Sequence, residues 1–253
     1  MLREHLFQRT APTDRWFRWR GGAVSRVEAL SDGVFALALA FLVTSIPIPH
    51  SYAELLLGLR HLPALGLCFA MLMLLWYSHH LFFRRFGLED APTVALNAAF
   101  LFLVLAYVYP LRFLASFLLW RFSGGALSPP VDGPYLAAGE GFWLMPFYSA
   151  GVIAVFGMLW CLHRHAWSRR RELELDAIEE HLTRAALRAH AISASIGVAS
   201  LAIALLWPQQ NAMAGWIYAC MGPAHAWHGR RSAQVLERLQ AQLVSQAEPE
   251  LRK

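Results

Sequence analysis

The chain has few charged residues and few cysteines, and each shortage excludes a class of protein. Asp, Glu, Lys and Arg make up only 15% of its 253 residues, whereas 57% are hydrophobic and the mean hydropathy is +0.39. This composition is too apolar for an ordinary soluble domain. Cys68, Cys161 and Cys220 lie in apolar segments at unrelated spacings, which excludes a disulfide framework and a Cys-x-x-Cys metal or redox site.

Motifs for catalysis and for nucleic-acid binding are also missing. There is no His-Glu-x-x-His zinc motif, no phosphate-binding glycine loop and no evident nucleophile, so we predict no catalytic residues, no metal ligands and no cofactor. The net charge is +5, but the basic residues lie between apolar runs instead of forming one patch. We therefore expect no nucleic-acid partner.

What the chain does contain is a series of long apolar segments. A helix needs about 20 apolar residues to cross the hydrocarbon core of a bilayer, and no period of about 20 to 50 residues repeats along the chain. The sequence thus predicts one all-α, multi-pass membrane unit in contact with lipid. Its six transmembrane helices are expected at Val27 to Ile46, Glu54 to Phe83, Pro92 to Trp120, Leu136 to Leu162, Ala185 to Trp207 and Asn211 to His228.

The distribution of arginine predicts the orientation. Basic residues concentrate in residues 1–26, 84–85, 164–188 and 230–253, while only Arg60, Arg112 and Arg121 fall elsewhere. By the positive-inside rule these segments are cytoplasmic, and so are both termini. We divide the chain into a basic N-terminal segment (1–25), which shows no cleavable signal peptide, the membrane unit (26–228) and a C-terminal tail (229–253). An apolar stripe on the tail fits lipid, the bundle or another subunit: Val235, Leu236, Leu239 and Leu243.

Polar residues from three predicted spans fall at a similar depth. Asp32 lies about six residues into the first span, His79 and His80 lie near the end of the second, Asn97 is near the start of the third, and Trp76 is one turn deeper than His80. An ionisable group inside a span is a functional-site hypothesis by default. The interpretation we favour is a hydrogen-bonded network between helices, and the alternatives are a proton relay or a metal site.

Helix geometry narrows the partners of Asp32. Arg26 lies six residues away on another face of the same helix, so a histidine or the Trp76 indole is the better partner. Adjacent His79 and His80 point about 100° apart, which makes it hard for both to face one ion. Leu37, in contrast, is about 140° from Asp32 around the helix.

Two motifs resemble a known family. Arg26-x-x-x-Leu30-Ser31-Asp32-Gly33 opens the first span, and Trp76-x-x-His79-His80-x-x-Phe83 ends the second. Together they are similar to the prokaryotic branch of the transmembrane protein 175 family, the lysosomal potassium channels. The resemblance implies a homotetramer in the bacterial inner membrane, in which four copies of the first span surround a pore for potassium ions.

The resemblance also implies roles for individual residues. Leu37 would form the tightest apolar ring of the pore, followed outward by Phe41 and Thr44, and these three residues also share one helix face by their spacing. The chain departs from the family pattern at Leu30, Leu37 and Ala40, where an aromatic residue, Ile and Thr are usual. A scaffold that orients the first span is expected from Arg26, Ser31, Asp32, Trp76, His79, His80 and Asn97.

The sequence therefore favours a potassium-permeable cation channel with an apolar constriction on the first span. One alternative is a proton-coupled transporter or proton relay, which would normally show an inverted repeat and broken helices. Internal breaks are visible only at Pro146 and at Gly222-Pro223, and these positions do not match in two halves. The other alternative is an intramembrane enzyme whose histidines bind a metal or haem.

Overall fold

The computed structural model describes residues 16–44, 46–128, 133, 135–136 and 141–247, which form helices and connecting segments with no strand among them. The predicted segment 1–25 and the tail after residue 247 therefore lie partly or wholly outside the described residues, and so does the side chain of Leu243.

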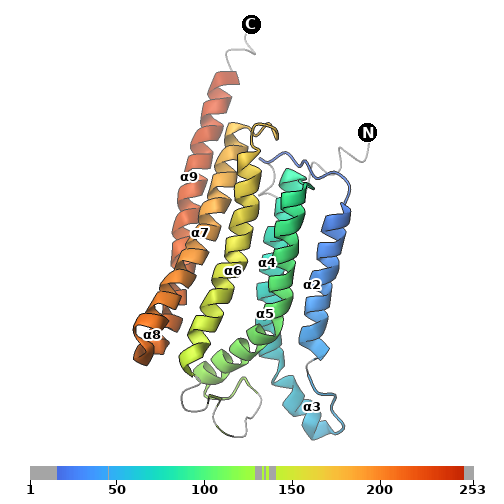
Figure 1. The fold of residues 1–253 in the computed structure, drawn as a ribbon, viewed down its shortest axis with the longest axis vertical. Helices are drawn as coiled ribbons and strands as arrows, with labels where there is room; N and C mark the ends of the chain where they lie inside the picture. The colour runs from blue at the N-terminus through green and yellow to red at the C-terminus, as the bar shows by residue number, and fades with distance from the viewer. Residues whose placement is uncertain (1–15, 45, 129–132, 134, 137–140, 248–253) are drawn as a thin grey trace.

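The helices form an elongated bundle whose long members run side by side (Figure 1). Five described helices are long and apolar enough to cross a membrane. They are α2 (Arg26–Thr44), α4 (Leu62–Phe86), α5 (Ala91–Ser123), α6 (Gly141–Ser168) and α7 (Ala177–Leu206), while the short helices α3 (Tyr52–Leu59) and α8 (Asn211–Trp216) lie at one end and α9 (Met221–Ala247) runs back beside α7.

The predicted second span is not a single helix. The chain breaks at Arg60 and His61, so that α3 ends at Leu59 and α4 begins at Leu62. Pro63 lies in the first turn of α4, where its missing N–H costs no intrahelical hydrogen bond. The residues on both sides of Arg60 and His61 are apolar, and the two helices were therefore predicted as one span.

The last two predicted spans also differ from the structure. α7 begins at Ala177, eight residues before the predicted start, because Asp176 and Glu179 form a capping box there. The predicted helix over Asn211 to His228 is divided into α8, a 3-10 turn over residues 217–220, and α9. Neither α8 nor α9 is thus among the five helices that are long and apolar enough to cross a membrane.

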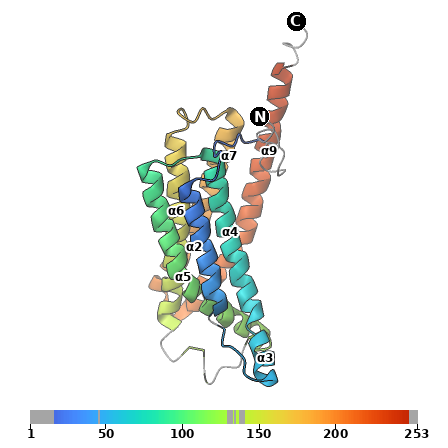
Figure 2. The ribbon, with the colours of Figure 1, turned by 90° about the vertical axis from the view of Figure 1, so that its right-hand side faces the viewer.

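The chain nevertheless returns along the bundle after α8. His228 Nε2 lies 2.9 Å from the carbonyl oxygen of Ala185, and His181 Nε2 lies 3.1 Å from Ser232 Oγ, which pairs α9 with α7 in opposite directions. The C-terminal end of α9 therefore lies at the same end of the molecule as residues 16–25, and Figure 2 shows it extending past the bundle.

α5 bends after Pro110, and its final part turns away from the line of its first part (Figure 1). Proline removes one helix hydrogen bond and crowds the preceding turn. The carbonyl of Pro110 accepts a hydrogen bond from Tyr148 Oη of α6 at 2.6 Å. This contact fixes the bend, which carries Arg112 toward the end of α2.

Residues 16–25 form a strap across the end of the bundle. Phe17 is buried, and Arg20 pairs with the buried Glu179 of α7 at 2.6 Å. Gly21 donates a backbone hydrogen bond to Arg84 of α4, and a Cβ on Gly21 would lie 2.6 Å from the Phe83 carbonyl oxygen. The strap leads directly into α2, so the start of α2 is tied to α4 and α7.

Candidate functional site

α2 has one covered face and one uncovered face. Its buried residues follow helical spacing and pack against α4 and α5: Glu28, Ser31, Phe35, Ala38 and Leu42. On the other side, Leu37 is 45% exposed, Phe41 is 52% exposed and Thr44 is exposed. Three small residues are also exposed on this side of α2: Gly33, Ala36 and Ala40.

A buried network joins α2, α4 and α5 behind the covered face. Asn97 Nδ2 donates to Ser31 Oγ at 3.0 Å, and Asn97 Oδ1 lies 2.7 Å from His79 Nε2. Because the amide oxygen can only accept, His79 must carry its proton on Nε2. Its Nδ1 is buried with no hydrogen-bond partner among the described residues, and its ring stacks on Phe100. Ser31, His79 and Asn97 thus meet in one cluster.

Asp32 belongs to a second, more open cluster. Trp76 Nε1 donates a hydrogen bond to Asp32 Oδ1 at 2.8 Å. The Trp76 ring stacks on His80 at 5.2 Å between centroids. Asp32 itself is exposed at the edge of the uncovered face. The adjacent histidines are therefore divided between the two clusters, with His79 inside the bundle and His80 beside Trp76.

Sequence reasoning missed Glu28, the charged residue most deeply buried on α2. It is 4% exposed, and its carboxylate lies 3.0 Å from Arg84 Nη2 and 3.6 Å from His80 Nδ1. Arg84 also donates to the Gly22 carbonyl at 3.0 Å. The spacing of Glu28 from Ser31 and Phe35 was the available signal. Arg26, in contrast, is exposed and makes no hydrogen bond, ion pair or ring contact among the described residues.

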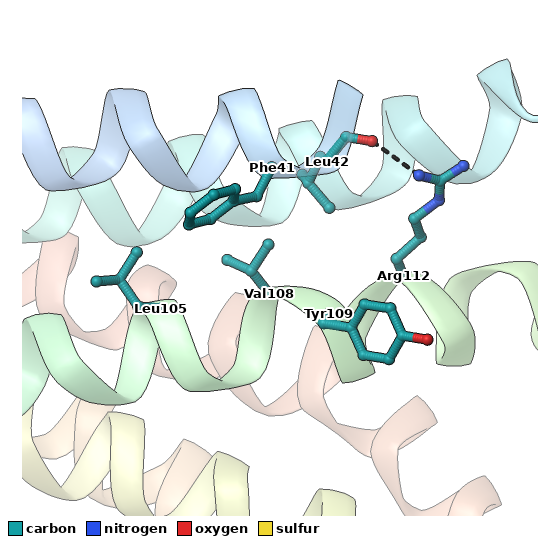
Figure 3. A pocket seen from close by; sticks show the side chains of 6 residues that line it. All are labelled: Phe41, Leu42, Leu105, Val108, Tyr109 and Arg112. Atoms are coloured by element: carbon teal, nitrogen blue, oxygen red, sulfur yellow. Dashed lines mark hydrogen bonds between the residues drawn. The ribbon is translucent and has the colours of Figure 1, made fainter. Parts of the chain in front are cut away.

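Arg112 holds the opposite end of α2. Its Nη1 donates to the Leu42 carbonyl at 2.9 Å, and its Nη2 lies 3.4 Å from His61 Nδ1. Figure 3 shows the hydrogen bond between Arg112 and Leu42 beside a pocket between α2 and α5, over which Phe41 lies. The volume of this pocket is about 220 Å³. Burial, and then the nearby Arg112 charge, lower the pKa of His61. A neutral His61 accepts a hydrogen bond from the guanidinium.

Asp90 joins α5 to α6 at the end of the bundle that carries the strap. It caps α5 through Thr93 N, and its Oδ2 lies 2.7 Å from His165 Nε2 and 3.2 Å from Arg169 Nη2. Partial burial alone would raise the pKa of the carboxyl, but the hydrogen bonds from Thr93 and His165 lower it overall. Among the described residues, no group of three or more His, Cys, Asp or Glu side chains is arranged to hold a metal ion.

Comparison with known proteins gives consistent matches. The family model described as the endosomal/lysosomal potassium channel TMEM175 matches residues 26–110, which hold both polar clusters. A potassium channel of Marivirga tractuosa is 32% identical over 88% of this chain and 93% of its own length. A potassium channel of Streptomyces collinus is 35% identical over 37% of this chain and 48% of its own length.

Two solved structures are similar. The potassium channel MtTMEM175, crystallised as a variant with a nanobody–MBP fusion, has a TM-score of 0.77 and 31% identity over 89% of this chain and 99% of that chain. A protein from Chamaesiphon minutus, described as a homologue of the lysosomal potassium-selective channel TMEM175, shares the fold, with a TM-score of 0.51 and 20% identity over 82% of this chain and 96% of that chain. With an identity of 32% over nearly the whole length of the Marivirga protein, this chain belongs to the TMEM175 potassium channel family, a family of channels and not of enzymes.

Proposed function

We propose that this protein is a potassium-permeable cation channel, formed by four copies of the chain around α2. The relatives that carry the name potassium channel support this function. The ions would pass along the uncovered face of α2, with Leu37 forming the apolar constriction and Phe41 and Thr44 lying farther out.

One observation carries the proposal: Asp32 is exposed on a helix of membrane-spanning length. A carboxylate that faces lipid within a span is costly, by about 2.5–3.5 kcal/mol at the centre on insertion scales. Within one chain it has the Trp76 indole on one oxygen, which leaves most of its hydrogen-bonding capacity unused. A neighbouring chain or a water-filled pore therefore has to cover this side of α2.

Small residues on the uncovered face also favour contact with a neighbouring chain. Gly33, Ala36 and Ala40 are exposed there, and small residues are typical of surfaces where membrane helices approach one another closely. Leu37 lies about 140° around the helix from Asp32. In a ring of four α2 helices, Leu37 would face the axis while Asp32 lies toward the seam with the next subunit.

An apolar ring selects ions by the loss of their hydration. Potassium holds its water shell less tightly than sodium, so it passes a narrow apolar ring at a smaller penalty, and the same ring closes when it dewets. We expect modest selectivity for this reason. The contacts Ser31–Asn97–His79 and Trp76–Asp32 would hold α2 at the rotation that presents Leu37 to the axis.

We also infer that both ends of the chain are cytoplasmic and that the protein lies in the bacterial inner membrane. Residues 16–25 and the C-terminal end of α9 lie at one end of the bundle, and this end carries Arg84, Arg85 and the arginines of residues 164–188. The positive-inside rule places such an end in the cytoplasm.

Potassium flux into liposomes tests the function, and a cysteine in place of Leu37 tests the path. The purified protein should discharge a potassium gradient faster than a sodium gradient. In Leu37→Cys a charged thiol reagent should reduce the flux, whereas Leu205→Cys, at an exposed leucine on α7, should conduct with or without the reagent. Liposomes that stay sealed to potassium would refute the channel, and equal responses at the two cysteines would refute the path.

A further inference from the structure

The second half of the bundle contains an uncharged stretch bounded by arginines on both sides. Residues 189–229 include no Asp, Glu, Lys or Arg, and they run from α7 through α8 into α9. Arg188 is the last charged residue before this stretch, and Arg230 and Arg231 are the first ones after it. These arginines therefore mark the membrane boundary on two helices that lie side by side.

The pairing of α7 with α9 brings the arginines to a similar depth. Ser232 lies opposite His181, and His228 lies opposite Ala185. Arg231 and Arg188 are therefore separated along the bundle by less than two helical turns, about 9 Å. Side chains lean toward the N-terminus of their own helix, and because α7 and α9 run in opposite directions, these two lean toward one another.

The two side chains also lie on the same side of the pair of helices. From the residues that contact the partner helix, Arg188 is displaced by about 60° around α7 and Arg231 by about 90° around α9, both toward the surface of the bundle. Arg188 is exposed and has no hydrogen bond, ion pair or ring contact among the described residues. The Arg231 guanidinium lies 4.2 Å from the ring centroid of Trp227, which is 57% exposed.

Below Arg188, two exposed apolar residues follow on the same face of α7. Ala202 is exposed and Leu206 is 66% exposed, and both lie within about 40° of Arg188 around the helix. Exposed tryptophan beside arginine is typical of the level of the lipid headgroups. The surface is thus basic and aromatic at the boundary, and apolar beneath it.

We propose that Arg188 and Arg231 bind the headgroup phosphate of an anionic phospholipid, whose acyl chain runs down α7 toward Ala202 and Leu206. The phosphate accepts hydrogen bonds from both guanidinium groups, and Arg188 gains the anionic partner that the described part of the chain does not supply. The apolar strip below the arginines distinguishes a phospholipid from free phosphate, which has nothing to place there. The site lies on α7 and α9, away from α2, and its existence does not depend on conduction.

Native mass spectrometry of the purified full chain tests this site, with phosphatidylglycerol and phosphatidylcholine of identical acyl chains as the probes. The wild type should retain phosphatidylglycerol in preference to phosphatidylcholine. Arg188→Gln and Arg231→Gln should each weaken retention by about fivefold. Arg230→Gln is the matched control, because it removes the same charge from a neighbouring position that points away from α7.

Three results would overturn the proposal. They are equal retention of the two lipids, an equal loss in Arg230→Gln, and displacement of the lipid by inorganic phosphate at low millimolar concentration, which would indicate a site for the free anion. If Arg188→Gln does not yield folded protein, Arg231→Gln decides the question alone, since Arg231 is exposed on α9.

Discussion

The indole nitrogen of Trp76 on α4 donates a hydrogen bond to the Asp32 carboxylate on α2 at 2.8 Å. This bond joins the edge of the uncovered face of α2 to the neighbouring helix. It leaves Leu37, farther around the same helix, 45% exposed. The side of α2 that carries Asp32 is therefore held by α4, whereas no described residue buries Leu37.

Trp76→Phe removes the donor while keeping an aromatic ring beside His80. We expect a loss of about 1 kcal/mol in stability, which is typical of a hydrogen bond between membrane helices, and altered conduction because one of the contacts that orient α2 is lost. Thermal unfolding in detergent and potassium flux are the measurements. Trp160→Phe, at a partly exposed tryptophan of α6, is the control. Equal shifts in the two variants would show that loss of the indole, not of its bond to Asp32, is responsible.

Asn97→Ala should destabilise the bundle more than Trp76→Phe. The change leaves the N–H of His79 Nε2 buried without an acceptor, which costs about 1–3 kcal/mol, while Ser31 Oγ loses one donor but keeps its own hydrogen bond to the Val27 carbonyl. A double-mutant cycle with Ser31→Ala measures the coupling, because Ser31→Ala removes the other side of the Asn97–Ser31 hydrogen bond. Strict additivity of the two changes would contradict the contact.

Glu28→Gln should loosen the start of α2. The carboxylate is buried against Arg84 at 3.0 Å, and removing one partner of a buried ion pair typically costs about 3–5 kcal/mol because the other charge remains. The double variant with Arg84→Gln should recover part of this loss, since it removes the uncompensated guanidinium. Unfolding in denaturant would reveal the pattern, and a double variant less stable than Glu28→Gln would refute it.

Stability should fall on acidification through Asp90. Its folded-state pKa is lowered, so the native state binds the proton more weakly than the unfolded chain, whose carboxyl has a pKa of about 3.9. The contribution is therefore complete above the unfolded pKa and is lost as the pH falls through the folded pKa. Asn also caps helices well, so Asp90→Asn should show a shallower acid decline of the melting temperature than the wild type. Parallel profiles from pH 7 to pH 3 would contradict this.

Apolar run length predicted α2 and α5 closely, because a span has to be long and uncharged whatever its partners are. It failed at residues 217–220, where the helix is interrupted within an apolar segment, and at Arg60 and His61, which were included in one span although they interrupt the apolar run. The bend at Pro110 was overlooked, although its direction also depends on Tyr148 of α6, a contact that no local pattern contains.

Some of the polar contacts could likewise be predicted from the sequence and others could not. Asp32, His79 and Asn97 stood out because polar groups are rare inside spans, and the structure places each against a residue of another helix. Sequence reasoning assigned no role to Glu28 or to Arg112. Their roles depend on burial and on contacts between distant segments, which composition does not encode.

The central claim is that Leu37 of each chain faces Leu37 of its neighbours, and disulfide cross-linking tests it most directly. In a background with Cys68, Cys161 and Cys220 replaced by alanine, Leu37→Cys should form covalent dimers rapidly on mild oxidation of the membrane-embedded protein. Leu205→Cys on α7 should form no covalent dimer under the same conditions. If Leu37→Cys also forms no covalent dimer while the protein conducts potassium, the uncovered face of α2 does not line a shared axis.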